Sequence, residues 1–173
     1  MPYITEEFWQ MLGNKELIIS QKFPEYDELK IDKKSELAED FIRDTGADIE
    51  SIIKLLGKKP QKIYIYVASD WKHNMHDIVK QEKTFDKIMK SASRDSELKK
   101  IMPEVQRVAK QLVKNAYSLQ ETLSVKEEYG ALSNAIDFFK NQFSCGIFVM
   151  HEKDGKHERA KNALPGKPAI VIE

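Results

Sequence analysis

Residues 60–79, PQKIYIYVASDWKHNMHDIV, combine a short apolar run, an acidic–aromatic–basic turn and the start of an amphipathic helix. The run from Ile63 to Val67 consists of β-branched and aromatic residues and has no polar face. Such a run predicts a central strand that is covered on both sides. Apolar residues then recur at helical spacing. This stretch therefore predicts a buried strand that leads directly into a helix.

Helical periodicity dominates the rest of the chain. Ile4 to Leu12 has apolar residues on one face and ends at Gly13, whereas residues 20–31 form a polar connector that Pro24 breaks. Further helices are predicted over residues 35–56 with an interruption at Gly46, over several segments within 72–115 with starts near Asp95 and at Met102, and over 125–143. The helix from Met102 is expected to bury Val105, Val108, Ala109, Leu112 and Val113. Residues 116–126 are expected to be a connecting segment.

Two more apolar runs complete the predicted sheet. They are GIFVM at residues 146–150 and AIVIE at residues 169–173. Short strands between several helices are typical of an α+β fold. We predict a small mixed β-sheet, mostly buried, packed with several α-helices.

The composition is that of a globular protein. Of the 173 residues, 41% are hydrophobic and 32% are charged. No apolar run approaches the roughly 20 residues that span a bilayer, and the N-terminus lacks the pattern of a signal peptide. The single cysteine, Cys145, excludes an internal disulfide and suits a reducing compartment. We therefore expect a cytoplasmic protein.

Positive charge is concentrated in the middle of the chain, although the formal net charge is zero. Residues 58–115 carry 14 basic and 7 acidic side chains, whereas residues 1–57 carry 7 and 13. A local positive potential attracts the phosphates of nucleic acids, but a lysine-rich helix is usually a solvated face. The candidates for phosphate contacts are Lys58, Lys59, Lys62 and Lys72. Trp71 is either a stacking partner for an unpaired base or an anchor in the core.

Side chains that could carry out catalysis occur without the partners that catalysis needs. His73 and His76 share a helical face, but no further ligand follows at metal-site spacing, so a capping or surface role is expected. Cys145 has no neighbouring His and Asp pattern and is expected to be a small buried side chain. Asp70 could be a general base at the end of a strand, but we prefer a role as the cap of the next helix. Glycine-rich phosphate-binding motifs do not occur. The residues thus predict no catalytic site and no metal site.

Three separated stretches resemble one family of enzymes. Residues 2–13, PYITEEFWQMLG, resemble the helix that closes the anticodon-binding bundle of class I synthetases for leucine, isoleucine and valine. Phe23-Pro24 stands where that family has a Trp-Pro pair. Residues 58–72, KKPQKIYIYVASDWK, are similar to the start of the C-terminal domain of archaeal and eukaryotic leucyl-tRNA synthetases. Residues 163–173, ALPGKPAIVIE, resemble the end of the archaeal form.

The resemblance implies a C-terminal fragment of a longer ligase. Residues 1–57 would be a remnant of the helical anticodon-binding bundle with a connector, and residues 58–173 a C-terminal tRNA-binding domain. The HIGH and KMSKS motifs, on which the family's ATP and leucine sites depend, are absent from the sequence, as is the editing insertion. Leucine–tRNA ligation with ATP and Mg would therefore belong to upstream domains, and no cofactor is expected in this fragment.

The resemblance also implies tRNA(Leu) as the partner, held by its long variable arm, alongside the upstream domains of the same enzyme. In this chain the matching residues are Ile170, Ile172 and Glu173. The apolar side chains would pack against unstacked bases, and Glu173 would accept hydrogen bonds from base amino groups. The alternative is a protein-interaction module that docks through apolar strand edges without binding RNA. Salt distinguishes the two, because phosphate contacts weaken steeply as salt rises.

Overall fold

The structure, a computed structural model, forms two compact units, Met1–Asp32 and Lys33–Glu173. The described residues are 2–23, 25, 27, 31–82, 84–114 and 121–173. The predicted break at Pro24 and the first part of the predicted connection, residues 116–120, lie outside the described residues. No helix in the described part of the chain is both long and apolar enough to cross a membrane.

The first unit contains the predicted N-terminal helix. It comprises α1 (Pro2–Met11), a turn at Gly13 with φ 87°, and the short 3-10 helix η1 (Ile18–Ser20). The indole Nε1 of Trp9 donates a hydrogen bond of 2.8 Å to the carbonyl of Glu16. Several large apolar side chains of this unit are exposed: Tyr3, Phe8, Met11, Leu12, Ile19 and Phe23.

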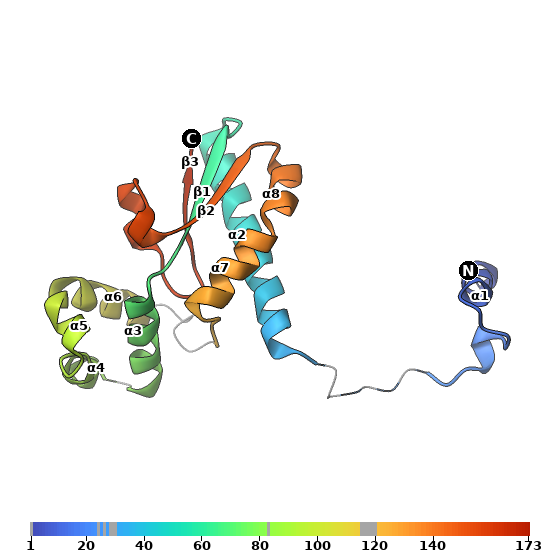
Figure 1. Cartoon of the computed structure of the whole chain (residues 1–173), viewed down its shortest axis with the longest axis horizontal. Coiled ribbons are helices and arrows are strands. Elements are labelled where there is room, and N and C mark those ends of the chain that lie inside the picture. The colour runs from blue at the N-terminus through green and yellow to red at the C-terminus, as the bar shows by residue number, and fades with distance from the viewer. Residues whose placement is uncertain (1, 24, 26, 28–30, 83, 115–120) are drawn as a thin grey trace. The chain divides into compact units, whose positions relative to one another are not determined.

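The predicted strands form a mixed sheet in the second unit. Within the described residues the sheet has three strands in the order β2-β1-β3 (Figure 1). The central strand β1 (Lys62–Val67) is parallel to β2 (Gly146–His151) and antiparallel to β3 (Ala169–Ile172). The three strand positions and the α+β fold class are confirmed.

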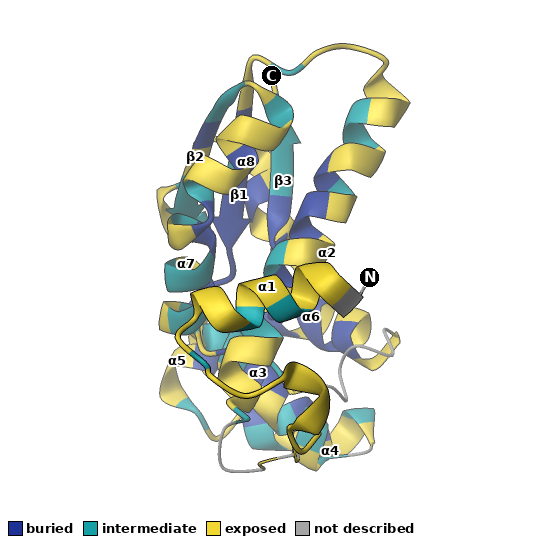
Figure 2. Ribbon diagram, turned by 90° about the vertical axis from the view of Figure 1, so that its right-hand side faces the viewer, coloured by how far each residue is buried: buried dark blue, intermediate teal, exposed yellow. Residues whose placement is uncertain are grey.

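One face of the sheet is covered by three helices (Figure 1). These are α2 (Lys33–Leu56), α7 (Val125–Asn134) and α8 (Ile136–Phe143). Ile63 and Ile65 of β1 point toward this face, where they join one core cluster with Ile49, Leu132 and Phe139. All five side chains are fully buried, and Figure 2 shows the buried stretches on β1 and along α2.

Two predicted helix limits are wrong. α2 continues through Gly46, because this residue is buried against α8 and packing there outweighs its low helix propensity. The helix predicted over residues 125–143 is divided at Ala135, which has φ −86° and ψ 1°. Leu132 before this break and Phe139 after it are both fully buried.

The remaining helices form a second core next to the end of β1 where α3 begins (Figure 1). They are α3 (Asp70–Gln81), α4 (Phe85–Ala92), α5 (Ser96–Lys100) and α6 (Met102–Lys114). Their shared core contains Met75, Ile88, Leu98 and Val108. The predicted start at Asp95 is confirmed, since its carboxylate accepts hydrogen bonds from the first backbone amides of α5. The prediction that Val113 is buried is wrong, because it lies at the margin of the apolar stripe of α6 and is 49% exposed.

Two 3-10 helices follow β2 and cover part of the opposite sheet face. They are η4 (Glu152–Asp154) and η5 (Glu158–Asn162). Ala160 packs against Tyr66 in a small third cluster. Gly155 is required here, because a Cβ at this position would lie 2.7 Å from the Cβ of Ala160.

Candidate functional site

The structure brings one of the predicted lysines together with the predicted terminal residue. Lys58 and Lys59 are exposed in the loop before β1, and Lys62 is the exposed first residue of that strand. The backbone N–H of Lys62 donates to the carbonyl of Glu173 at 3.0 Å, and the N–H of Glu173 donates to the carbonyl of Lys62 at 2.9 Å. Lys62 and the carboxylate-bearing residue Glu173 are therefore neighbours across the sheet.

Ile170 and Ile172 occupy a different environment from Glu173. Both are half-buried on β3 and pack against the core cluster beneath α2, α7 and α8. Because side chains alternate along a strand, Val171 and Glu173 lie on the opposite face. The two isoleucines thus lie at the edge strand with only part of their surface accessible.

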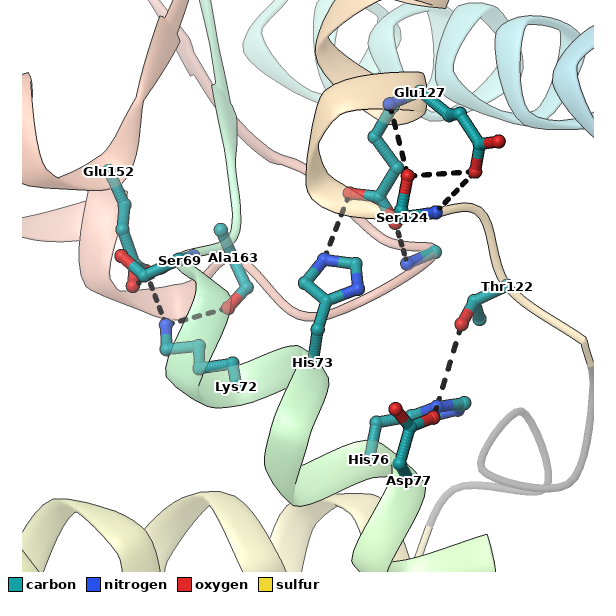
Figure 3. A network of polar contacts seen from close by, with 12 residues as sticks. Ser69, Lys72, His73, His76, Asp77, Thr122, Ser124, Glu127, Glu152 and Ala163 are labelled. Atoms are coloured by element: carbon teal, nitrogen blue, oxygen red, sulfur yellow. Dashed lines mark hydrogen bonds and ion pairs between the residues drawn. The ribbon is translucent and has the colours of Figure 1, made fainter. Parts of the chain in front are cut away.

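Lys72 is a structural residue, contrary to the prediction that it contacts phosphate. Its side chain is 2% exposed, and its ammonium forms a buried ion pair with Glu152 (Figure 3). It also donates to the carbonyls of Lys161 at 2.8 Å and Ala163 at 2.7 Å. Burial lowers the pKa of Lys72, and the hydrogen bond with Glu152 opposes this effect. All three ammonium hydrogens have acceptors, so none points to solvent.

Trp71 packs as a core anchor, which was one of the two interpretations of its role. It is half-buried against the cluster formed by α3–α6. The ammonium of Lys72 lies 5.6 Å from the centre of its ring. Part of the indole is therefore committed to packing against this core.

The histidines of α3 point to separate partners. His73 Nε2 lies 3.5 Å from Glu128 Oε2, and His76 Nδ1 lies 3.5 Å from the hydroxyl of Thr122 (Figure 3). Among the described residues, no group of three His, Cys, Asp or Glu side chains is placed to hold a metal ion. The pair is part of the packing between α3 and the segment that leads into α7.

Neither Asp70 nor Cys145 has the surroundings of a reactive group. Ser69, not Asp70, is the N-cap residue of α3, so the predicted cap is wrong by one position. The carboxylate of Asp70 instead lies 3.5 Å from the ammonium of Lys153 on the surface. Cys145 is half-buried, and burial raises the pKa of its thiol, which disfavours the reactive thiolate.

An aromatic row on the second sheet face was missed by the sequence reasoning. Phe148, Tyr64 and Val171 are direct neighbours across β2, β1 and β3. The Tyr64 and Phe148 rings are stacked, with centres 5.1 Å apart and planes inclined by 20°. The ring of His157 also lies near Tyr64, with its centre 4.9 Å away and its plane inclined by 52°. The alternation in KIYIYV and GIFVM contains the signal, since every second residue of a strand shares a face.

His157 connects this row to the side-chain carboxylate of Glu173. Its Nδ1 lies 2.6 Å from the hydroxyl of Tyr66, and its Nε2 lies 3.1 Å from Glu173 Oε1. Burial raises the pKa of Tyr66, with further contributions from Tyr64 and Glu173, so its hydroxyl stays protonated. His157 thus links the hydroxyl of Tyr66 to the carboxylate of Glu173. The half-exposed carboxylate is thereby held beside the aromatic row.

Comparisons with known proteins match this chain along its length. Residues 1–70 match the family described as anticodon-binding domain of tRNA ligase. The chain is 34% identical over 177 residues to "Leucine--tRNA ligase" of Methanococcus aeolicus, 31% over 175 residues to that of Methanocaldococcus jannaschii, and 33% over 175 residues to that of Pyrococcus horikoshii. Each alignment covers 99% of this chain and 18% of the relative. The chain therefore spans about a fifth of the length of these relatives.

Proposed function

We propose that this chain, which is similar to archaeal leucine–tRNA ligases over 99% of its length, is the C-terminal part of such an enzyme and the part that recognises tRNA. It holds tRNA(Leu) by the long variable arm, while upstream domains of the parent enzyme join leucine to the tRNA with ATP and Mg in the cytoplasm. The observation that supports this best is the match over 99% of the chain to proteins with this one name.

Exposed charge supports contact with the RNA backbone. Lys58, Lys59 and Lys62 lie close together in the sequence at the start of β1 and are all exposed. Lysine ammonium groups bind phosphates as mobile point charges. We include these three lysines in the tRNA surface together with Glu173 and the accessible parts of Ile170 and Ile172. Lys72 is left out because its ammonium is buried, and Trp71 is left out because it packs against the core of α3–α6.

The division of the chain at residue 57 remains part of this proposal. The family match extends to residue 70, whereas the compact units divide after Asp32. α2 contacts α7 and shares a core cluster with the central strand β1. It is therefore structurally part of the second unit. We propose that residues 58–173 carry the variable-arm contacts and that α2 stabilises the sheet to which these residues belong.

Binding to tRNA(Leu) and to a tRNA with a short variable arm, measured side by side at low and moderate salt, tests the proposal. We expect a preference for tRNA(Leu) that persists at moderate salt. Replacing Lys58, Lys59 and Lys62 by alanine should weaken binding and reduce the salt slope by about 0.7–0.9 for each lost phosphate contact. The matched control replaces three exposed lysines of α4 and α6: Lys87, Lys90 and Lys110.

Equal affinity for both tRNAs would contradict variable-arm recognition. The alternative, docking of another protein on the edge of β3, receives no support from the three relatives described above, each of which is named as a tRNA ligase. It would gain support if this chain bound neither tRNA.

A further inference from the structure

We propose that the exposed ring of Phe148, stacked on Tyr64, is the platform on which one unpaired base of the RNA stacks; this inference rests on the function proposed above. The two rings come from neighbouring strands and are nearly parallel, 5.1 Å apart. Phe148 is 43% exposed although it is a large apolar residue within a strand.

The row of rings has an open end at Phe148. Tyr64 stacks with the ring of Phe148 and also contacts the tilted ring of His157. Within the described residues, β2 is an edge strand, so Phe148 is the last ring of the row. One face of its ring packs on Tyr64, and its exposed surface is therefore the ring edge and the face turned away. A flat base placed there would extend the stack by one ring.

Glycine at position 146 makes room for this arrangement. Gly146 is two residues before Phe148 on β2 and therefore on the same sheet face. A Cβ at Gly146 would lie 3.2 Å from Cε2 of the Phe148 ring, closer than an ordinary contact. The missing side chain lets the ring lie over the strand next to Lys62, which is directly opposite Gly146.

The groups around the platform match a nucleotide. Lys62 shares the face with Tyr64 and lies directly opposite Gly146 on β2, so it supplies a cation for a phosphate beside the platform. Base–aromatic stacking between such groups is the usual way in which single-stranded RNA is held. Under the proposed function, the unpaired bases in reach of this domain are those at the tip of the variable arm.

The size of the surface favours a base over a protein partner. A stable protein interface buries roughly 800 Å² on each partner. A single aromatic side chain supplies at most about 150–250 Å², and the other apolar residues of this face, Tyr64, Met150 and Val171, are already half-buried. The patch therefore fits one ring and is too small for a protein surface.

The test uses Phe148→Leu in this chain, which keeps an apolar side chain but removes the π face. The probe is tRNA(Leu) with 2-aminopurine at each unpaired position of the variable-arm tip. With the unchanged chain, we expect one position to lose fluorescence on binding, as stacked 2-aminopurine does. Phe148→Leu should abolish that quenching and weaken binding by about 5-fold to 100-fold, the effect of losing one base–aromatic stack.

Two further variants make the result specific. Gly146→Ala retains the ring but displaces it, and we expect it to reduce the quenching as well. Phe138→Leu removes a 58% exposed ring of α8 and should change neither affinity nor quenching. Urea unfolding of each variant checks that the fold is retained.

Failure of this inference and failure of the proposed function give different results. If the chain prefers tRNA(Leu) but Phe148→Leu binds like the unchanged chain, or no tip position is quenched, the stacking platform is refuted and the proposed function stands. If the chain shows no preference for tRNA(Leu), both are refuted.

Discussion

Replacing Lys72 by methionine should destabilise the second unit strongly. The variant keeps a long unbranched side chain but leaves the Glu152 carboxylate, 8% exposed, without its cation. The carbonyls of Lys161 and Ala163 lose a donor as well. Removing one partner of a buried ion pair costs about 3–5 kcal/mol, because an uncompensated charge remains inside. If Lys72 were instead an exposed lysine that binds phosphate, its replacement would change the free energy of unfolding very little.

The expected loss is large enough to measure by two methods. In a unit that runs from Lys33 to Glu173, each kcal/mol shifts the melting temperature by about 3–4 °C, so we expect a decrease of about 10–20 °C. Urea unfolding followed by circular dichroism should show a lower midpoint at unchanged slope. The control is Lys153→Met, an exposed lysine near Asp70, which should change stability by less than about 0.5 kcal/mol.

A double-mutant cycle separates burial from the ion pair. Adding Glu152→Gln to Lys72→Met removes the uncompensated charge, so the double variant should lose less stability than the sum of the two single variants. The reasoning is refuted if Lys72→Met unfolds within about 1 kcal/mol of the unchanged chain. If the same variant then bound tRNA more weakly, the prediction that Lys72 contacts a phosphate would be supported.

Three other predictions concern charge, capping and packing in the second unit. The hydrogen bond from Lys34, together with those from Ser124, lowers the pKa of Glu127 from 4.5 to about 2. The associated stability is complete above pH 4.5 and is lost as the pH falls toward 2, and Glu127→Gln should remove this part of the pH dependence of the urea midpoint. Ser124→Ala removes the N-cap oxygen of α7 and should cost about 0.5–2 kcal/mol at neutral pH; an unchanged midpoint would count against the capping box. Gly155→Ala would place a methyl group 2.7 Å from another one and should cost about 1–3 kcal/mol, whereas Gly130→Ala, with open space around it, should stabilise α7 by roughly 0.5–1 kcal/mol. The opposite order of melting temperatures for the two glycine variants would refute this interpretation of the packing.

The strands were predictable from the sequence because their signal is local. Residues 63–67, 146–150 and 169–173 each form an apolar run bounded by turn residues, and each corresponds to an observed strand within about one residue. The capping aspartate at position 95 was also found, since an N-cap acts on the next two or three amides. Features that depend on a few consecutive residues could therefore be predicted from the sequence.

The wrong predictions concern features that depend on residues far apart in the sequence. The burial of Lys72 depends on acceptors 80 to 91 residues away, on Glu152, Lys161 and Ala163, and no local pattern indicates them. The continuity of α2 at Gly46 likewise depends on packing against a helix far along the chain. The aromatic face is an intermediate case, because alternation identifies its members, but their exposure depends on how much of the face η5 covers.

The order of the strands along the chain determines the order in which this fold can assemble. β1 ends at Val67, and its parallel partner begins only at Gly146, after 78 intervening residues. At a synthesis rate of roughly 5–20 residues per second, β1 waits about 4–16 s for that partner, and its antiparallel neighbour β3 is made later still. The helices α3–α6 are contiguous in sequence and close their own core during this interval. We therefore expect the helical cluster to fold first, while the apolar central strand depends on α2 for cover until β2 and β3 have been synthesised.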